Sequence, residues 1–404
     1  MRMTMRRVLA VMALGGAVTS AAACRKQTKA RLTPQAFELT NGLQVELVAG
    51  PCGDGATVAV LYEVGTDHDP AGASGLAHVV ERAVAQRERP VEVGADHAVT
   101  AVVVRGDQVG GEIEGVAARM TTLGLTAAEL ERGKAEVIAE LTQRRGGDAA
   151  LTALSFAAES VQPTRGNGWR GGVAAEVAAI DLAAAEGFGR AHWKPINARL
   201  VVIGRFDATK VRQQIEAAFA GVPPGAPPVL RAAPETTVTG TLVMGNAPAA
   251  VAIAGPAPAL TAPLYPAFLI LAARLAPSAY DPLAQPETLF VTGPVTAGEP
   301  AEAAATRLRD ETAALLARPL APAEVAAART RFAGLLGVDA LEPAACQRDP
   351  RGFAIARARR AHLTIDGERL TAALAATTQA QLDEAAALFS PKRTAAVIAG
   401  GAIQ

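Results

Sequence analysis

The sequence predicts an α/β protein built from two similar halves. Apolar runs of strand length alternate with segments of helical periodicity, and 50% of the 404 residues are hydrophobic, enough for large buried cores. The prolines in residues 222–228 cannot continue a helix or a central strand, so they indicate a linker. Residues 195–204 also align with residues 391–400 at a constant offset, as expected for a repeated unit. We therefore expect a first half over residues 36–222, a linker over 223–235 and a second half over 236–404.

The N-terminal residues 1–23 are typical of an export signal. Arg2, Arg6 and Arg7 form a positively charged start, and the uncharged run that follows is rather short for a bilayer span. Small residues directly before Cys24 resemble a bacterial lipobox, in which this cysteine would become the lipidated first residue. An ordinary signal-peptidase site is the alternative. With residues 24–35 as a polar tether, the prediction is an exported, lipid-anchored protein of the bacterial cell envelope that faces the periplasm.

Charge and cysteine content narrow the possible functions. The formal net charge is zero and no basic stripe is present, which argues against a nucleic-acid partner. Apart from Cys24, the cysteines are Cys52 and Cys346, far apart and without the C-x-x-C spacing of zinc or redox motifs. A disulfide between them is possible in an oxidising compartment, but two buried free thiols are the expected state.

Local patterns predict the elements of the first half. Alternating residues around Asn41-Gly42 are a strong hairpin signal, and Thr126 with Glu129 forms a capping box at the start of a helix. A hairpin is expected over residues 37–48, and strands are expected over residues 58–64, 98–105 and 198–204. Helices are expected over residues 75–85, 113–120, 126–145, 182–193 and 210–219.

The second half is predicted to repeat this plan. Strands are expected over residues 237–244 and 250–254, followed by a helix over 266–275. The arginine-rich residues 351–360 are expected to form a solvated helix face that pairs with local acidic residues.

The helix over residues 75–85 carries the most informative polar cluster. His78, Glu81 and Arg82 share one face, because residues three and four apart on a helix are neighbours. The inverted zinc motif H-x-x-E-H needs two neutral imidazoles one turn apart, with the glutamate as general base for a metal-bound water. Arg82 stands in the place of the second imidazole, and a guanidinium offers no lone pair and repels a divalent cation. The sequence therefore predicts a metallopeptidase framework that has lost its metal.

Three segments share the order and spacing of a known family. They are Gly65-Thr66-Asp67, residues 75–81 (GLAHVVE) and residues 193–204 (WKPINARLVVIG). Together they resemble the M16 peptidases, which include pitrilysin, insulin-degrading enzyme and the mitochondrial processing peptidase. The resemblance implies two homologous halves, each an α/β layer of the LuxS/MPP-like metallohydrolase type. It further implies that the halves close like a clam into a chamber around an extended peptide.

The same resemblance implies a zinc ion held by the two histidines of the motif and a glutamate on a later helix. His78 matches the first histidine, Glu81 the catalytic base and Glu140 the third ligand, whereas Arg82 replaces the second histidine. Gly133 stands where many members carry an accessory glutamate. We expect the Arg82 guanidinium to pair with Glu140 or Glu81, which would turn a catalytic centre into a structural ion pair.

These observations leave more than one function open, so whether the chain is an enzyme stays uncertain. The interpretation we favour is a non-catalytic M16-like envelope protein without a cofactor, which supports an active sister subunit or holds extended peptides. The alternative is an active zinc-dependent metalloendopeptidase that uses His78, Glu140 and a third ligand from elsewhere, such as His68 or His97. A structural lipoprotein unrelated to peptides is a third interpretation.

Overall fold

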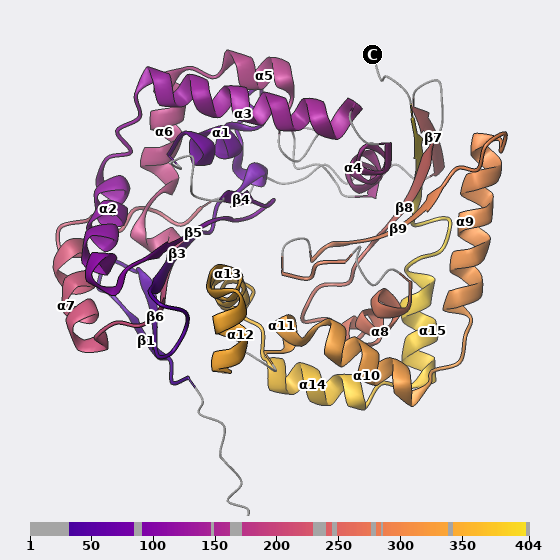
Figure 1. The fold of residues 1–404 in the computed structure, drawn as a ribbon. Helices are drawn as coiled ribbons and strands as arrows, with labels where there is room; N and C mark the ends of the chain where they lie inside the picture. The colour runs from indigo at the N-terminus through magenta and orange to yellow at the C-terminus, as the bar shows by residue number, and fades with distance from the viewer. Residues whose placement is uncertain are drawn as a thin grey trace, which may run out of the picture. The chain divides into compact units, whose positions relative to one another are not determined.

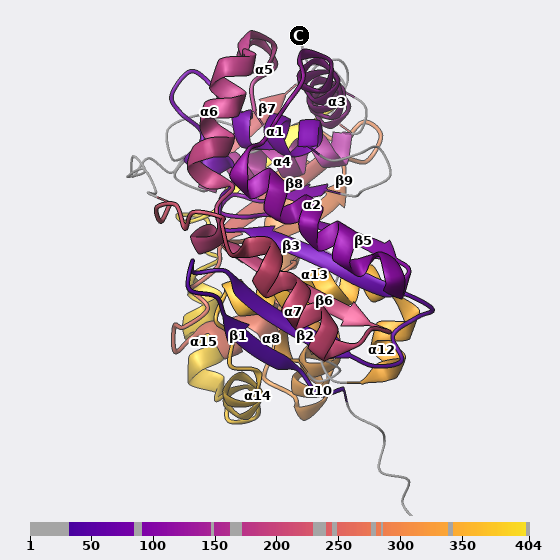
Figure 2. The same ribbon diagram turned by 90° about the vertical axis from the view of Figure 1, so that its left-hand side faces the viewer.

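Two β-sheets with helices on both faces organise the chain (Figure 1, Figure 2). The computed structural model describes residues 32–84, 91–146, 149–161, 172–228, 240–244, 249–275, 280–283, 286–337 and 342–400. The predicted signal peptide, Cys24 and the larger parts of the predicted tether and linker lie outside these residues. None of the helices in the described ranges combines the length and the apolar character needed to span a membrane.

The first sheet and its helices come from residues 35–219. The elements are β1 (Gln35–Glu38), β2 (Gln44–Ala49), β3 (Ala56–Tyr62), η1 (Thr66–His68), α1 (Leu76–Val84), β4 (Val91–Val93), β5 (Ala98–Val104), η2 (Gly106–Gln108), α2 (Val109–Thr121), α3 (Ala127–Gly146), α4 (Ala149–Val161), α5 (Ala174–Ala179), α6 (Leu182–His192), η3 (Pro195–Asn197), β6 (Ala198–Gly204) and α7 (Ala208–Phe219). The strands and helices predicted for this part are present, with ends that differ by a few residues. Local patterns did not predict β4, α4 or α5.

The second sheet and its helices come from residues 240–399. The elements are β7 (Gly240–Met244), β8 (Ala250–Pro256), α8 (Tyr265–Leu275), β9 (Thr288–Pro294), α9 (Ala301–Leu316), α10 (Pro322–Arg331), α11 (Ala333–Leu336), α12 (Pro343–Arg348), α13 (Pro350–His362), α14 (Gly367–Ala375), α15 (Gln379–Ala387) and β10 (Ala395–Ala399).

The turn and helix-cap residues predicted for the first part are found in those roles. Gly42 has a φ of 87°, a left-handed conformation that glycine adopts without a steric cost, and it turns the chain between β1 and β2. The Asn41 amide donates to the carbonyls of Phe219 and Val222, so the turn is held to the end of α7. The backbone N–H of Glu129 donates to the Thr126 hydroxyl at 3.2 Å, the predicted cap of α3.

The two sheets repeat one strand arrangement. The first has the order β1-β2-β6-β3-β5-β4 and the second the order β7-β10-β8-β9. β6 pairs parallel with β2 and antiparallel with β3, and β10 pairs parallel with β7 and antiparallel with β8. The aligned segments found in the sequence, residues 195–204 and 391–400, thus contribute equivalent strands of the two sheets.

Each sheet is covered on one face by a helix from the other part of the chain (Figure 1, Figure 2). Ala354, Ile355 and Ala358 of α13 pack with β2, β3, β5 and β6 of the first sheet. Ala153 and Ala157 of α4 pack with β8, β9 and β10 of the second sheet. Residues 31–404 consequently form one compact unit, and neither sheet has a complete core without the other part.

The prediction of a solvated face for residues 351–360 is wrong. Arg359 of α13 is only 7% exposed and its guanidinium pairs with Glu92 at 2.8 Å, while Arg357 donates to Glu46 at 3.0 Å. Both acids belong to strands of the first sheet, more than two hundred residues earlier in the chain, which local pattern reading does not connect to the helix.

The expectation of two free thiols is also wrong. Cys52, in the loop after β2, forms a disulfide with Cys346 of α12, and the two Cα atoms are 5.3 Å apart. Both side chains are buried among the residues between α13 and the first sheet. Packing α12 and α13 against this sheet is what brings the two cysteines together.

Candidate functional site

The helix α1 that carries the candidate site is buried along almost its whole length. Leu76, Val79 and Val80 pack into the core of the first sheet, and His78 and Glu81 are buried among them at 5% and 1% exposure. The Asp69 carboxylate accepts hydrogen bonds from the backbone N–H groups of Gly75 and Ala77, both at 2.7 Å, and so fixes the start of the helix.

Arg82, His78 and Glu140 converge from α1 and α3. The Arg82 guanidinium forms an ion pair with one carboxylate oxygen of Glu140, as predicted for this pair. The other Glu140 oxygen lies 3.3 Å from His78 Nε2, and Arg82 Nε donates to the same His78 nitrogen at 3.5 Å. The guanidinium therefore contacts both residues that match zinc ligands of the M16 motif.

This donor set does not fit a zinc ion. A zinc site needs at least three protein ligands with free lone pairs. Here the lone pairs of His78 and Glu140 that would face a metal ion accept from the Arg82 guanidinium instead. Among the described residues, no third histidine, cysteine, aspartate or glutamate lies close enough to both to complete a metal-binding group. The cluster is arranged as an ion pair that joins α1 to α3.

Glu81, which matches the catalytic base, faces the interior. Burial raises the pKa of its carboxyl from 4.5 to about 7, although the charges of Arg119 and Arg82 act in the opposite direction. Its Oε1 atom is buried without a hydrogen-bond partner. Around neutral pH this carboxyl is thus partly protonated and contributes unfavourably to folding when it ionises.

Replacing Glu81 with glutamine should change how stability depends on pH. A raised folded-state pKa contributes stability that is present below pH 4.5 and is lost as the pH rises through about 7, by about 3 kcal/mol in total. Urea unfolding measures this effect at pH 4.5 and pH 8. Relative to the wild type, the free energy of unfolding of Glu81→Gln should be higher by about this amount at pH 8 than at pH 4.5.

The matched control is Glu114→Gln, at an exposed position on α2, which should follow the wild type at both pH values. If Glu81→Gln keeps the same offset from the wild type at pH 4.5 and pH 8, the carboxyl is not destabilising when ionised and the assignment of its environment is wrong.

Gly133 lets α1 and α3 approach closely enough for the ion pair. A Cβ atom at this position would lie 2.9 Å from the backbone nitrogen of Ala83 and 2.9 Å from the carbonyl oxygen of Val79. The accessory glutamate that many M16 members carry here would not fit between the two helices. This close contact between the two backbones explains why glycine stands at position 133, and it brings Glu140 within reach of Arg82.

We expect Gly133→Ala to destabilise the protein by about 1–3 kcal/mol, because the added methyl group must push α1 from α3. Gly111→Ala on α2 is the control, since a Cβ there meets nothing within 4 Å and alanine favours helices. Thermal unfolding measures both, and equal melting temperatures for the two variants would contradict the close packing at Gly133.

The two histidines considered as substitute ligands lie in other clusters. His68 Nδ1 accepts from the backbone N–H of Gly65 at 3.1 Å, and its ring lies 5.9 Å from that of His192 between centroids. His97 Nε2 accepts from Arg359 Nε at 3.0 Å. Neither is grouped with His78 and Glu140 in the part of the chain that the structure describes.

Sequence reasoning missed the cluster around His97. Asp96 accepts from His97 Nδ1 at 2.8 Å and lies 3.1 Å from His362 Nε2 on α13, and the three could in principle group around a metal. Both ring nitrogens of His97 are already engaged, because Arg359 donates to the second one. Burial disfavours the His362 charge, but Asp96 and Glu63 outweigh it and raise the pKa of His362 to about 9. The cluster ties α13 to the first sheet as a network of charges.

Comparison with known proteins agrees with this architecture. Residues 179–288 match the family model described as the peptidase M16 inactive domain. No curated protein matches the chain in sequence.

Several solved structures share the fold. A protease from Helicobacter pylori has a TM-score of 0.68 and 17% identity, and the match covers 91% of this chain and 99% of that one. The peptidase M16 inactive domain from Pseudomonas fluorescens has a TM-score of 0.69 and 14% identity, covering 92% and 98%. Pitrilysin has a TM-score of 0.65 and 16% identity, but 91% of this chain covers only 44% of pitrilysin.

The pitrilysin match corrects the predicted chamber. The two parts of this chain do not correspond to two halves that close around a peptide, because 91% of the chain matches only 44% of that enzyme. The helices exchanged between the sheets give the physical reason, since they join both parts into a single unit. The chain therefore has the fold of the M16 peptidases, and residues 179–288 match the family model of their inactive domain.

Proposed function

We propose that this protein is a non-catalytic M16 subunit of the cell envelope that pairs with a second chain and holds extended peptides with it. The observation that carries the proposal is the contact of the Arg82 guanidinium with both Glu140 and His78. A metallopeptidase needs these two side chains free for zinc, whereas here they stabilise the packing of α1 on α3.

The length of the chain supports pairing. One chain spans 44% of pitrilysin, so a chamber of the pitrilysin kind would need two such chains. The second chain could be an active M16 sister subunit, which would supply the chemistry, or another copy of this protein. Extended peptides would bind through backbone pairing at a sheet edge, which requires no metal.

Peptidase and metal measurements on the purified full chain test the lack of catalysis. We expect no stoichiometric zinc after dialysis and no cleavage of denatured casein with or without added zinc. Tightly held zinc together with cleavage that a chelator abolishes would favour the zinc-dependent endopeptidase instead and overturn the proposal.

Pairing is tested by mixing. The product of an adjacent gene with an intact H-x-x-E-H motif should co-elute with this chain, and the molar mass from light scattering should equal one copy of each. A chain that stays monomeric both alone and with such a partner would argue against the assembly role.

The envelope location predicts that Cys24 anchors the protein. The Cys52–Cys346 disulfide suits an oxidising compartment and supports this assignment. We expect the wild type to remain in the membrane fraction after a high-salt wash, and Cys24→Ala to be released as soluble protein, because one acylated cysteine supplies the attachment. Labelling with radioactive palmitate measures the acylation directly. Equal release of wild type and variant would show that Cys24 is not lipidated.

A further inference from the structure

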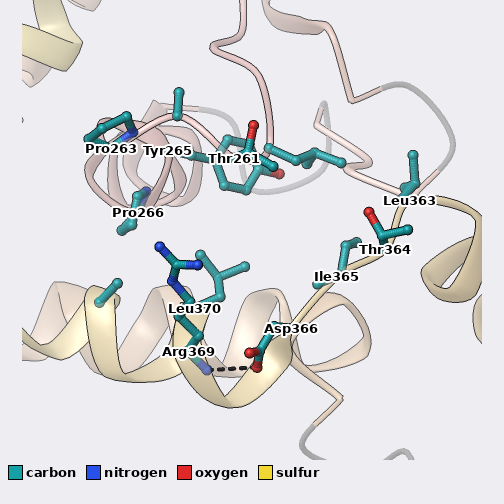
Figure 3. Close-up of a pocket in the computed structure, with 13 residues that line it drawn as sticks. Thr261, Pro263, Tyr265, Pro266, Leu363, Thr364, Ile365, Asp366, Arg369 and Leu370 are labelled. Atoms are coloured by element: carbon teal, nitrogen blue, oxygen red, sulfur yellow. Dashed lines mark hydrogen bonds between the residues drawn. The ribbon is translucent and has the colours of Figure 1, made fainter.

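A pocket of about 290 Å³ lies in the second part of the chain, away from α1, between the start of α8 and the first turns of α14 (Figure 3). The loop that leaves α13, residues 363–365, closes one end of it. Most of the lining is apolar, with contributions from Leu260, Pro263, Pro266, Leu363, Ile365 and Leu370. Pockets of this kind with a few polar groups are typical of small-molecule sites.

The guanidinium of Arg369 offers the pocket a partner for an anionic ligand. Arg369 is the only cation among the lining residues, and Figure 3 shows its side chain extending from α14 toward Pro266 on α8. Within the described part of the chain its guanidinium takes part in no ion pair. The one acid in the lining, Asp366, is engaged as the cap of α14, where it accepts from the backbone N–H of Arg369 at 3.0 Å.

The end of the pocket opposite Arg369 contains a strained residue. Thr364 has a φ of 51°, and it is the one non-glycine residue in the described ranges with a positive φ. The backbone N–H of Ile365 donates to the Arg360 carbonyl at 3.2 Å and that of Thr364 to the Ala361 carbonyl at 3.3 Å. This is the Schellman termination of a helix, in which the left-handed position is normally glycine.

A β-branched side chain at this position costs stability that glycine would not cost. The side chain responsible for the cost lines the pocket. Local strain is stored preferentially at binding sites, where the side chain serves the ligand instead of the fold. Arg369 and Thr364 are therefore two independent features that point to the same pocket.

We propose that this pocket binds a small apolar monocarboxylate. The carboxylate pairs with the Arg369 guanidinium and the hydrocarbon lies between Pro263, Pro266 and Leu370, with Thr364 also in the lining. At about 30 Å³ for each small group, the volume accommodates roughly ten non-hydrogen atoms. The site is independent of the role proposed for α1.

Isothermal titration calorimetry of the full chain with sodium octanoate, which has the right size, tests this site. We expect a dissociation constant below about 1 mM, and at least about tenfold weaker binding of octanol, which lacks the carboxylate. Arg369→Gln should weaken octanoate binding about tenfold, while Arg393→Gln, at an exposed position outside the pocket, should leave it unchanged.

Thr364→Gly separates binding from folding. Because glycine relieves the left-handed strain, we expect its melting temperature to rise by about 1–3 °C while octanoate affinity falls severalfold. A more stable variant that binds octanoate as tightly as the wild type would remove Thr364 from the site.

Other outcomes would overturn the proposal as a whole. They are the absence of saturable binding up to about 10 mM, equal affinity for octanol, or unchanged octanoate affinity in Arg369→Gln. The tripeptide Gly-Gly-Leu and its amide distinguish the source of the carboxylate. Tighter binding of the free-acid tripeptide than of octanoate would assign the pocket to peptide C-termini and refute the small-molecule assignment.

Discussion

Replacement of Arg82 by histidine is expected to create a zinc site. The variant would place a second imidazole one helical turn from His78, on the same face as Glu81, and Glu140 already lies 3.3 Å from His78. It would also remove a cation whose repulsion of a divalent ion costs about 8 kcal/mol at about 4 Å and an effective dielectric of 20. We expect zinc affinity to rise by at least about a thousandfold, or about 4 kcal/mol.

Metal analysis after dialysis and competition with a coloured chelator measure this gain. Arg82→Ala removes the cation without adding a ligand, so the difference in zinc affinity between Arg82→His and Arg82→Ala measures what the second imidazole contributes. Combining Arg82→His with Glu140→Gln should lose most of the gain. If the wild type takes up zinc as tightly as Arg82→His, the guanidinium is no obstacle to the metal and the non-catalytic assignment fails.

Removal of the disulfide is expected to be the most destabilising of the changes considered for the fold. Cys52 and Cys346 are 294 residues apart, so their link removes much of the freedom of the unfolded chain. Cys346→Ala should lower the free energy of unfolding by about 5 kcal/mol, because the chain-entropy contribution grows with loop length.

Urea unfolding of oxidised and reduced protein measures this effect. Reduction with dithiothreitol should lower the free energy of unfolding of the wild type to that of Cys346→Ala. The same treatment should not change the stability of the variant. Cys52→Ala should behave like Cys346→Ala, and the double variant should be no worse than either. Equal stability of oxidised and reduced wild type would show that the bond contributes nothing to the fold.

The sequence anticipates those parts of the fold that depend on near neighbours. The hairpin at Asn41-Gly42, the cap at Thr126 and the periodicity of α1 and α3 each involve residues a few positions apart. The pairing of Arg82 with Glu140 followed from one substitution in a motif whose ligands must converge, and the structure contains it. The roles of His78 and Glu81 as remnants of a metal site remain predictions.

The features that the sequence does not reveal depend on contacts between residues that are far apart in the chain. Arg359 looks like a surface residue until α13 lies on the first sheet, where Glu92 and His97 surround it. Cys52 and Cys346 look like isolated thiols for the same reason. The closeness of α1 to α3 at Gly133 is a backbone contact, and no side-chain pattern reports it. Tertiary packing decides each of these cases.

The reciprocal placement of α4 and α13 predicts what a single backbone cut would do. A protease that nicked the chain within residues 222–228 would give two fragments, and each would keep its helix inserted in the other's sheet. The nicked protein should travel as one species in gel filtration and separate only after reduction and denaturation. Either fragment expressed by itself would expose an uncovered apolar sheet face, so the two must be produced together to remain in solution.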